Sequence, residues 1–526
     1  MSTQMRDPLI RKPSVPINTF DAESNVLYPL WVAMGAAIGA FLFGWTLGFS
    51  GPAAQPMENS NDELTSPFVC TEWNTDDPDS ENYALCKSSP QGDLFFSIVN
   101  LGCMIGAVLG GFLMDRFGRK SGKRAKKEEE CEATDSLLTH TFTALFLASI
   151  PFCGVFLWQS LATVYWQLMT ARILTGTAVG VVSCTVPVYI AEVAPPRLRG
   201  AMGCVNQLFI TVGIFAVYAA GLAFEKSVNL EYEPEVEKGF ARWTLISQVG
   251  AVVAGIYSIV TLVLLPESPK WLVTNDKLES ARENLVKLRG ESYDVSGEID
   301  DQLNAAAIAN SNNEKARLSD LLKPELRKQM FVGCSLMVLQ QFTGINAVIF
   351  FSTDIFSDAG VEGSTGSVIV MGVQVVFTLI ACLVVDKLGR KPLLYIASGG
   401  MFVSSLSMAA FYFLKDAGNE IDMLAIGSMI GYIVFFSLGM GAIPWLLMSE
   451  IFPANVRGIA GSFATGLNWT CSFIMTESFG TINNLLGPSW VFVAFAVELA
   501  VTFLFIWKFV PETKGKTLEE VEAFFV

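Results

Sequence analysis

The hexapeptide DKLGRK, Asp386 to Lys391, has a near copy, DRFGRK, at Asp115 to Lys120. Two further pairs follow in the same order: AEVAPPRLRG from Ala191 with SEIFPANVRG from Ser449, and PESPK from Pro266 with PETKG from Pro511. Motifs that recur in one order at long spacing indicate copies of one structural unit. The chain is therefore predicted to contain two related halves, arranged as a parallel repeat.

Each half is rich in apolar residues. Hydrophobic residues make up 52% of the 526 residues and charged residues only 16%, which is typical of a polytopic membrane protein and excludes an ordinary soluble enzyme. A helix needs about 20 apolar residues to cross the hydrocarbon of a bilayer. Twelve such runs begin near Leu30, Leu94, Thr141, Val164, Ala201, Trp243, Met330, Ser367, Leu393, Leu424, Ile459 and Trp490. Together with the repeat they predict an all-α membrane protein of two six-helix bundles.

The charges in the loops predict the orientation. Lysine and arginine in short loops are retained on the cytoplasmic side, and basic residues follow the second span (116–127), the fourth (197–199) and the eighth (387–391). The first loop, 52–93, is acidic and has only Lys87 as a basic residue. Both termini are therefore predicted to be cytoplasmic. The net charge of −15 lies mostly in loops and tails, and no nucleic-acid partner is expected.

The predicted organisation has five parts. A cytoplasmic tail (1–28) precedes the first bundle (29–265), a cytoplasmic linker (266–327) joins it to the second bundle (328–511), and a second cytoplasmic tail (512–526) follows. Apolar residues at helical spacing predict short amphipathic helices in the linker; these are Leu278, Ala281, Leu285 and Leu288. The chain shows no phosphate loop, no nucleophile elbow and no metal-ligand spacing, so neither a cofactor, a metal nor an enzymatic activity is predicted.

Of the ten cysteines, only Cys70 and Cys86 lie in the acidic first loop. An oxidising compartment on that side permits a disulfide between them. Two free thiols are the alternative.

Amide side chains inside a span need an explanation, because hydrocarbon offers them no partner. The stretch QQFTGINAVIFFS, 340–352, contains three amides, and on an unbroken helix Gln340, Gln341 and Asn346 would point about 100 to 140° apart. Gly344 permits a break in the helix at that point. The alternative use of such amides is hydrogen bonding between neighbouring helices.

Other predicted spans carry neutral polar residues at the same depth. These are Thr46 and Ser50; Gln207, Thr211 and Tyr218; Gln374 and Thr378; and Thr465, Asn468 and Ser472. Trp445 and Trp469 add flat aromatic faces, which suit the C–H surface of a sugar ring. The pattern predicts a central cavity that binds a neutral, polyhydroxylated molecule.

Taken together, these motifs resemble the sugar porter family of the major facilitator superfamily from about residue 30 to about residue 525. The resemblance rests on both D-[RK]-x-G-R-K elements, both E-x-x-P-x-x-x-R-G elements, PESP, PETKG, QQ-x-x-G-I-N and PW. It implies the major facilitator fold, alternating-access transport of a monosaccharide and function as a monomer in the membrane. By resemblance the sugar-contacting positions are Gln207, Gln340, Gln341, Asn346, Trp445 and Asn468. Gln374 stands where many plasma-membrane hexose carriers have asparagine.

The resemblance also suggests a subclass. FGWTLGFSGP, VQVVFT and IPWLLMSEIFP look like the animal glucose transporters of intracellular membranes and the plant vacuolar monosaccharide carriers. The membrane of residence is accordingly either the plasma membrane or a vacuolar or endolysosomal membrane.

Charged residues recur at the cytoplasmic ends of the predicted spans. They are Asp115, Arg119, Glu192, Arg199 and Glu267 in the first half, and Asp386, Arg390, Glu450, Arg457 and Glu512 in the second. The resemblance implies a gate whose ion pairs form when the bundle closes on that side and separate when it opens. The alternative, that these charges only set the topology, does not account for the repeated acids.

Proton-coupled members of the family carry an aspartate in the first span, where it pairs with an arginine of the fourth. Here the position is Thr46, and Arg172 is the expected arginine. Threonine does not titrate, so facilitated diffusion is expected. A proton-coupled sugar or polyol symporter is the alternative, with Glu477 or Glu498 as the acid. A sugar-sensing receptor would need a long signalling tail, and only 516–526 follow PETKG.

Overall fold

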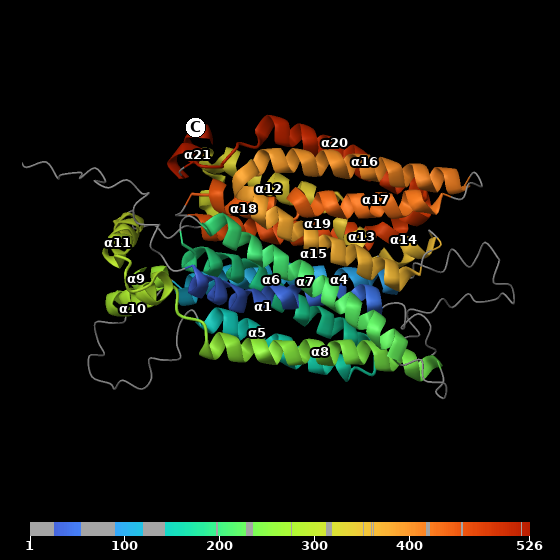
Figure 1. The fold of residues 1–526 in the computed structure, drawn as a ribbon, viewed down its shortest axis with the longest axis horizontal. Helices are drawn as coiled ribbons and strands as arrows, with labels where there is room; N and C mark the ends of the chain where they lie inside the picture. Colours follow the sequence, from blue (N-terminus) through green and yellow to red (C-terminus); the bar gives the residue numbers. More distant parts are fainter. Residues whose placement is uncertain are drawn as a thin grey trace, which may run out of the picture.

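The structure is a computed structural model that describes residues 26–53, 90–118, 142–195, 198–227, 235–274, 276–311, 318–350, 352–358, 360, 362–416, 421–453, 456–516 and 518–525. The predicted disulfide between Cys70 and Cys86, and the gate residue Arg119, lie outside these ranges. Within them the chain forms two bundles of long helices that run side by side along one axis (Figure 1).

Each bundle contains six spans. The first is built from α1 (Leu27–Gly48), α4 (Pro90–Gly118), α5 (Phe142–Ser160), α6 (Tyr165–Val193), α7 (Arg199–Ser227) and α8 (Glu235–Val263). The second is built from α12 (Arg327–Phe342) with α13 (Ile345–Phe350) and α14 (Ser352–Asp358), α15 (Gly363–Leu388), α16 (Arg390–Asp416), α17 (Asp422–Phe435) with η6 (Phe436–Met440) and α18 (Ile443–Ile451), α19 (Arg457–Leu486), and α20 (Pro488–Phe509). The twelve-helix prediction is confirmed for the part of the chain that is described.

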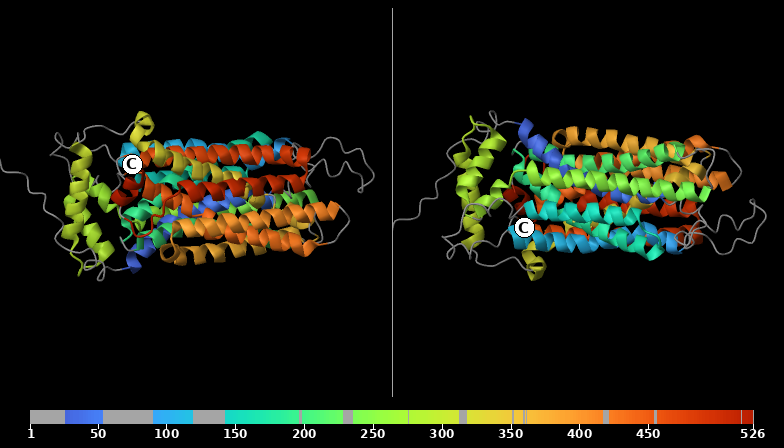
Figure 2. Two further views of the ribbon diagram at one scale, coloured as in Figure 1. Left: turned by 90° about the horizontal axis from the view of Figure 1, so that it is seen from above. Right: turned by 90° about the horizontal axis from the view of Figure 1, so that it is seen from below.

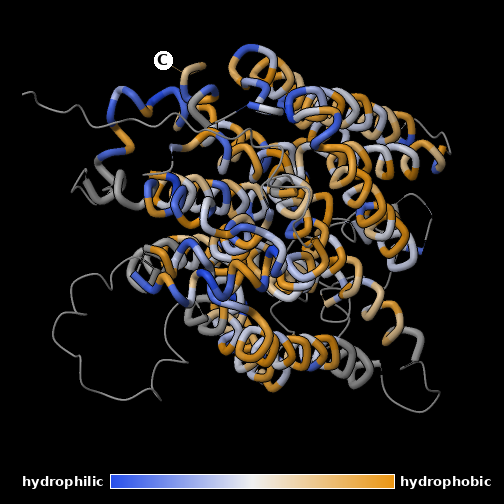
Figure 3. The backbone as a smooth tube through the Cα atoms, turned by 60° about the vertical axis from the view of Figure 1, so that its left-hand side comes forward, coloured by the Kyte–Doolittle hydropathy of each residue, from blue (hydrophilic) through white to orange (hydrophobic). Residues whose placement is uncertain are grey.

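The outer surface of the bundles is apolar. Large hydrophobic side chains such as Trp31, Val252, Leu383 and Leu504 are exposed, and hydrophobic residues run along the helices of both bundles (Figure 3). Nine described helical stretches are long and apolar enough to cross a membrane by length and composition. Such a surface is stable against lipid and costly in water. The chain is therefore a multi-pass membrane protein.

Short helices gather at one end of the bundles, called here the linker end (Figure 2). They are α9 (Pro269–Thr274), α10 (Leu278–Arg289) and α11 (Val295–Ser311), followed by η4 (Leu318–Leu322) and η5 (Pro324–Leu326); α21 (Leu518–Phe525) also lies at this end. As predicted, α10 is amphipathic and buries Ala281, Leu285 and Leu288, while Leu278 in its first turn is exposed.

Arg289 attaches these short helices to the first bundle. Its side chain is 1% exposed and donates to the carbonyls of Val193 and Ala194, at 2.9 and 3.3 Å, where α6 ends. It also forms an ion pair with Glu298 at 2.9 Å. A cation at a helix C-terminus satisfies carbonyls that have no partner within the helix.

Glycines allow α4 and α6 to pack backbone against backbone. A Cβ atom at Gly106 would lie 2.0 Å from the Thr177 carbonyl oxygen, and one at Gly180 would lie 2.2 Å from that of Cys103. Small residues four positions apart bring membrane helices into this close contact.

Two spans of the second bundle are broken near their middle. The break predicted at Gly344 is confirmed, because α12 ends at Phe342, Gly344 has a φ of +85°, and α13 begins at Ile345. The other break was not predicted: η6 is a π-helical turn, closed by a hydrogen bond of 2.9 Å from the Gly441 N–H to the Phe436 carbonyl. Breaks of this kind expose backbone groups within a membrane protein.

Candidate functional site

Three amides and a hydroxyl meet where the broken span α12–α13 faces α19. Gln341 Nε2 donates to Asn468 Oδ1 at 3.0 Å, and Asn346 Nδ2 donates to Gln341 Oε1 at 2.8 Å and to Ser472 Oγ at 2.6 Å. Gln341 and Asn346 are five positions apart and would diverge by about 140° on a continuous helix. The break at Gly344 therefore brings them together.

The second break supplies acceptors for Gln340. Gln340 Nε2 donates to the carbonyls of Met440 and Gly441 at 2.6 and 3.3 Å. Its Oε1 accepts from Asn468 Nδ2 at 3.1 Å, and the same Nδ2 lies 2.8 Å from the Met337 carbonyl. The π-helical turn and α12 are thus joined by side-chain amides, and we call Gln340, Gln341, Asn346, Asn468 and Ser472 the amide cluster.

The first bundle approaches this cluster through α7 and α1. A Cβ atom on Gly441 would lie 3.6 Å from Gln207 Nε2 on α7. Trp469, next to Asn468 on α19, packs against Phe43 of α1 with 5.4 Å between the ring centroids. Trp445 lies in the first turn of α18, directly after the π-helical turn. Both bundles therefore border one region.

Several buried polar atoms of the described residues have no hydrogen-bond partner, and two of them belong to residues of the predicted cavity. They are Oε1 of Gln374 on α15 and Nε1 of Trp469, on side chains that are 1% and 2% exposed. A buried polar group without a partner costs about 1 to 3 kcal/mol, so such atoms are usually satisfied by water or a ligand. They offer an acceptor and a donor to a bound hydroxyl group.

The amide cluster is closed off from solvent. Gln341 and Asn346 are 7% and 8% exposed, and Asn468 is fully buried.

The two bundles are also in contact at the end opposite the linker helices. Tyr218 Oη on α7 donates to the Ile349 carbonyl at 2.7 Å, and the rings of Phe96 and Phe350 stack with 6.0 Å between their centroids. Ser97 of α4 also donates to Glu477 of α19 there.

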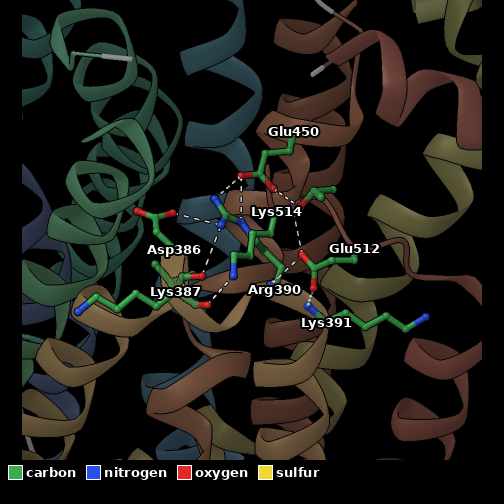
Figure 4. A network of polar contacts seen from close by, with 9 residues as sticks. Asp386, Lys387, Arg390, Lys391, Glu450, Glu512 and Lys514 are labelled. Carbon is green, nitrogen blue, oxygen red and sulfur yellow. Dashed lines mark hydrogen bonds and ion pairs between the residues drawn. The ribbon is translucent and has the colours of Figure 1, made fainter. Parts of the chain in front are cut away.

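Ion pairs and hydrogen bonds join four of the predicted gate residues at the linker end (Figure 4). Arg390 pairs with Asp386 at 3.1 Å and with Glu450 at 2.8 Å, and its backbone N–H donates to Glu512 at 3.1 Å. Lys391 adds a backbone hydrogen bond of 3.0 Å to Glu512. Asp386, Arg390, Glu450 and Glu512 all belong to the second half, and we call them the charge network.

Asp386 links the charge network to the first half. A Cβ atom on Gly200, in the first turn of α7, would lie 2.3 Å from Asp386 Oδ1. A residue larger than glycine would force the carboxylate to shift. The two halves are therefore in contact at the linker end in this structure.

The other described gate residues are not part of the charge network. Glu192 accepts a hydrogen bond of 2.7 Å from Ser268, and Arg457 donates to the Phe452 carbonyl at 3.1 Å. Asp115 lies in the last turn of α4 and Arg199 in the first turn of α7. Glu267 precedes α9, and its carbonyl accepts from Asn284 at 3.1 Å.

Arg172 and Thr46 are neighbours, as the resemblance suggested. Arg172 Nη1 donates to the Thr46 carbonyl at 3.0 Å, and Nη2 donates to Ser50 Oγ. The guanidinium lies over the rings of Phe49 and Phe95, 5.4 and 5.0 Å from their centroids. These partners are all neutral, so the cation is held by hydrogen bonds and aromatic faces.

Comparison with known proteins identifies the family. The model of the family described as "Sugar (and other) transporter" matches residues 32–125 and 136–525. The sugar transporter ERD6-like 6 of Arabidopsis thaliana is 34% identical over 93% of this chain and 88% of its own. The facilitated trehalose transporter Tret1 of Polypedilum vanderplanki is 32% identical over 93% and 86%.

Solved structures agree with this result. The proton:xylose symporter XylE, of the major facilitator superfamily, bound to 6-bromo-6-deoxy-D-glucose, superposes with a TM-score of 0.75 at 25% identity, over 95% of this chain and 99% of its own. The inward-open form of XylE from E. coli gives 0.69 at 25% identity, over 94% and 100%. These relatives transport sugars and are not enzymes. The chain belongs to the sugar transporter family of the major facilitator superfamily.

Proposed function

We propose that this protein is a facilitative uniporter of monosaccharides, hexoses such as glucose in particular, and works by alternating access as a monomer. The two bundles, 29–265 and 328–511, then lie in the plasma membrane or in a vacuolar or endolysosomal membrane. The linker helices and both termini lie in the cytoplasm. The observation that carries the proposal is the buried amide cluster, which is bordered by both bundles and closed toward both ends.

The chemistry of the cluster suits a neutral sugar. Each amide offers two N–H donors and an acceptor oxygen, which matches the alternating donor and acceptor roles of sugar hydroxyls. A charged substrate would instead require a compensating charge. Gln374 Oε1 and Trp469 Nε1 add an acceptor and a donor that a bound hydroxyl group would satisfy. Gln207, Gln340, Gln341, Asn346, Gln374, Trp445 and Asn468 are the proposed substrate-binding residues.

The names of the relatives point to substrates of two sizes, a monosaccharide and a disaccharide. Tret1 is a trehalose transporter by name, whereas XylE was solved with a glucose analogue. Uptake of labelled glucose into proteoliposomes, with unlabelled glucose, fructose, galactose, xylose, a polyol and trehalose as competitors, distinguishes them. We expect hexoses to compete and trehalose not to. Strong inhibition by trehalose alone would favour a disaccharide carrier.

Uniport is proposed because the neighbours of Arg172 are neutral. Without an acid at Thr46, protonation has no direct route to this cation. The alternative, proton symport, would depend on Glu477, which accepts from Ser97, or on Glu498, whose Oε1 accepts from Thr502 at 2.7 Å.

The contacts at both ends support alternating access. A sugar can leave only after contacts at one end have broken, either the charge network with Gly200 or the contact of Tyr218 with Ile349. We propose that the two bundles rock about the amide cluster to break them in turn.

Tyr218→Phe should weaken closure at the end opposite the linker helices. The change removes the hydroxyl that donates to Ile349 and keeps the ring, so closure should lose about 0.5 to 1.5 kcal/mol. The expected result is a greater distance between spin labels placed on α7 and α14 at that end. Unchanged distances would show that this hydrogen bond does not hold the end closed.

Trp445→Leu should reduce transport more than it reduces expression. The substitution removes an aromatic face from the start of α18 and retains an apolar side chain, so folding should be little affected. Uptake per molecule of purified protein measures the effect. An equal loss of protein and uptake would indicate that Trp445 has only a packing role.

A further inference from the structure

Two free cysteines face each other across the contact between the bundles. Cys382 of α15 donates from Sγ to the carbonyl of Cys204 on α7 at 3.4 Å. Neither thiol is in a disulfide, and their side chains are 8% and 3% exposed. The described free cysteines Cys103, Cys153, Cys184, Cys334 and Cys471 are the other thiols available for comparison.

The register of the two helices makes this contact part of the closure at the linker end. Gly200 lies against Asp386, and Cys204 and Cys382 are each four residues further along their helices, away from the linker end. Four residues are about one helical turn, so the thiols meet one turn inside the contact between Gly200 and Asp386. The same antiparallel register continues to Gly372, whose Cβ would lie 3.4 Å from the Phe215 ring.

We propose that Cys204 and Cys382 form a redox-sensitive pair whose disulfide locks the linker end closed and stops transport. The proposal rests on the proposed function in one respect, since it requires α7 and α15 to separate at this end during each cycle. A covalent bond between them prevents that separation. Reduction restores both thiols and therefore transport.

Hydrogen peroxide is a sufficient oxidant. One thiol loses its proton, the thiolate sulfur attacks a peroxide oxygen and the O–O bond breaks. The hydroxide that leaves takes up the proton, so a sulfenic acid and water result. The second thiol then attacks the sulfenic sulfur, forms the S–S bond and displaces a second water. In sum, two thiols and one peroxide give one disulfide and two waters.

Access to the thiols depends on the transport cycle. In the closed structure both side chains are buried, so peroxide can reach them only when the linker end opens. The sulfenic acid formed then meets the second thiol when the end closes again. Oxidation should therefore be faster during sugar exchange than in the absence of sugar.

The test uses the full-length protein in proteoliposomes. Samples are treated with hydrogen peroxide, the excess is removed with catalase, and both labelled-glucose uptake and cross-linked peptides are measured, the latter by mass spectrometry without reduction. We expect a peptide that joins Cys204 to Cys382, loss of uptake in proportion to the cross-linked fraction, and recovery after dithiothreitol. Cross-linked protein that transports normally, or peroxide treatment that leaves this pair unlinked, would overturn the proposal.

Serine variants provide the controls. C204S and C382S should transport as the reduced wild type does and should keep their uptake after peroxide, whereas C334S, at a half-buried cysteine of α12, should remain sensitive. Loss of uptake by oxidised C204S would overturn the proposal, because another thiol would then be responsible. Failure of reduced wild-type protein to carry any sugar would instead contradict the proposed function, and the peptide analysis would still decide whether the pair forms.

Discussion

Gln341→Ala should lower the affinity for sugar by about 1 to 3 kcal/mol, or roughly fivefold to 150-fold. Gln341 lies at the centre of the amide cluster, where it donates to Asn468 and accepts from Asn346. Alanine would remove both hydrogen bonds and leave a sugar hydroxyl without a partner in a site that excludes water. Equilibrium binding of labelled glucose to purified protein measures the effect.

Gln329→Ala is the matched control. Gln329 is a buried glutamine on the same helix, α12, but it lies in the first turn at the linker end. The same substitution there should leave the sugar affinity unchanged. Equal losses of affinity in both variants would show that the effect of Gln341→Ala comes from general loosening of α12. Unchanged affinity in Gln341→Ala would remove Gln341 from the site.

Arg390→Ala should open the linker end. Arg390 is the cation that holds Asp386 and Glu450 together, and without it three carboxylates, with Glu512, would face one another. Without Arg390, the Asp386 carboxylate loses the partner that holds it against Gly200 of the first half. A hydrogen bond to a charged group contributes about 1.5 to 3 kcal/mol, so the closed contact should weaken by up to about that much. In a variant that retains Cys382 as its only cysteine, maleimide should then label Cys382 faster, by up to roughly 10- to 150-fold.

Lys391→Ala is the control that distinguishes loss of the charge network from loss of one positive charge. Lys391 directly follows Arg390 in the first turn of α16. Its side chain donates to the Trp507 carbonyl outside the network, and the hydrogen bond from its backbone N–H to Glu512 survives the substitution. Labelling of Cys382 should therefore stay near the wild-type rate. Faster labelling in both variants to the same extent would attribute the effect to lost positive charge, and slow labelling in Arg390→Ala would mean that the network does not hold the gate.

The sequence predicted the fold well because membrane folding leaves strong signals. Hydrocarbon admits only segments that satisfy their own backbone hydrogen bonds, so the apolar runs and the repeated motifs were enough to predict two six-helix bundles. Gly344 could be predicted as a break because glycine between polar residues in a span allows a positive φ.

The individual contacts of the site could not be predicted from the sequence. The carbonyls of Met440 and Gly441 became partners of Gln340 only through the π-helical turn, and in the sequence FSLGMGAIPW only the glycines and the proline hinted at it. The contact of Tyr218 with Ile349 and that of Cys204 with Cys382 depend on how the two bundles dock. The sequence alone does not show how the helices of one bundle align with those of the other.

The gate shows the same limit. Repetition selected ten charged residues, and the structure joins Asp386, Arg390, Glu450 and Glu512 while Glu192 binds Ser268. Periodicity places a charge at the end of a helix, but it does not state which neighbour the side chain reaches. The pairing depends on side-chain rotamers and on the loops between the helices.

The central claim is that neutral groups of the two bundles pass a sugar down its own gradient with no proton involved. Labelled glucose uptake into proteoliposomes, with and without an imposed proton gradient that is acidic outside, tests it most directly. The account predicts the same final internal concentration in both cases, equal to that outside. Accumulation of glucose above the outside concentration when the gradient is imposed would contradict it.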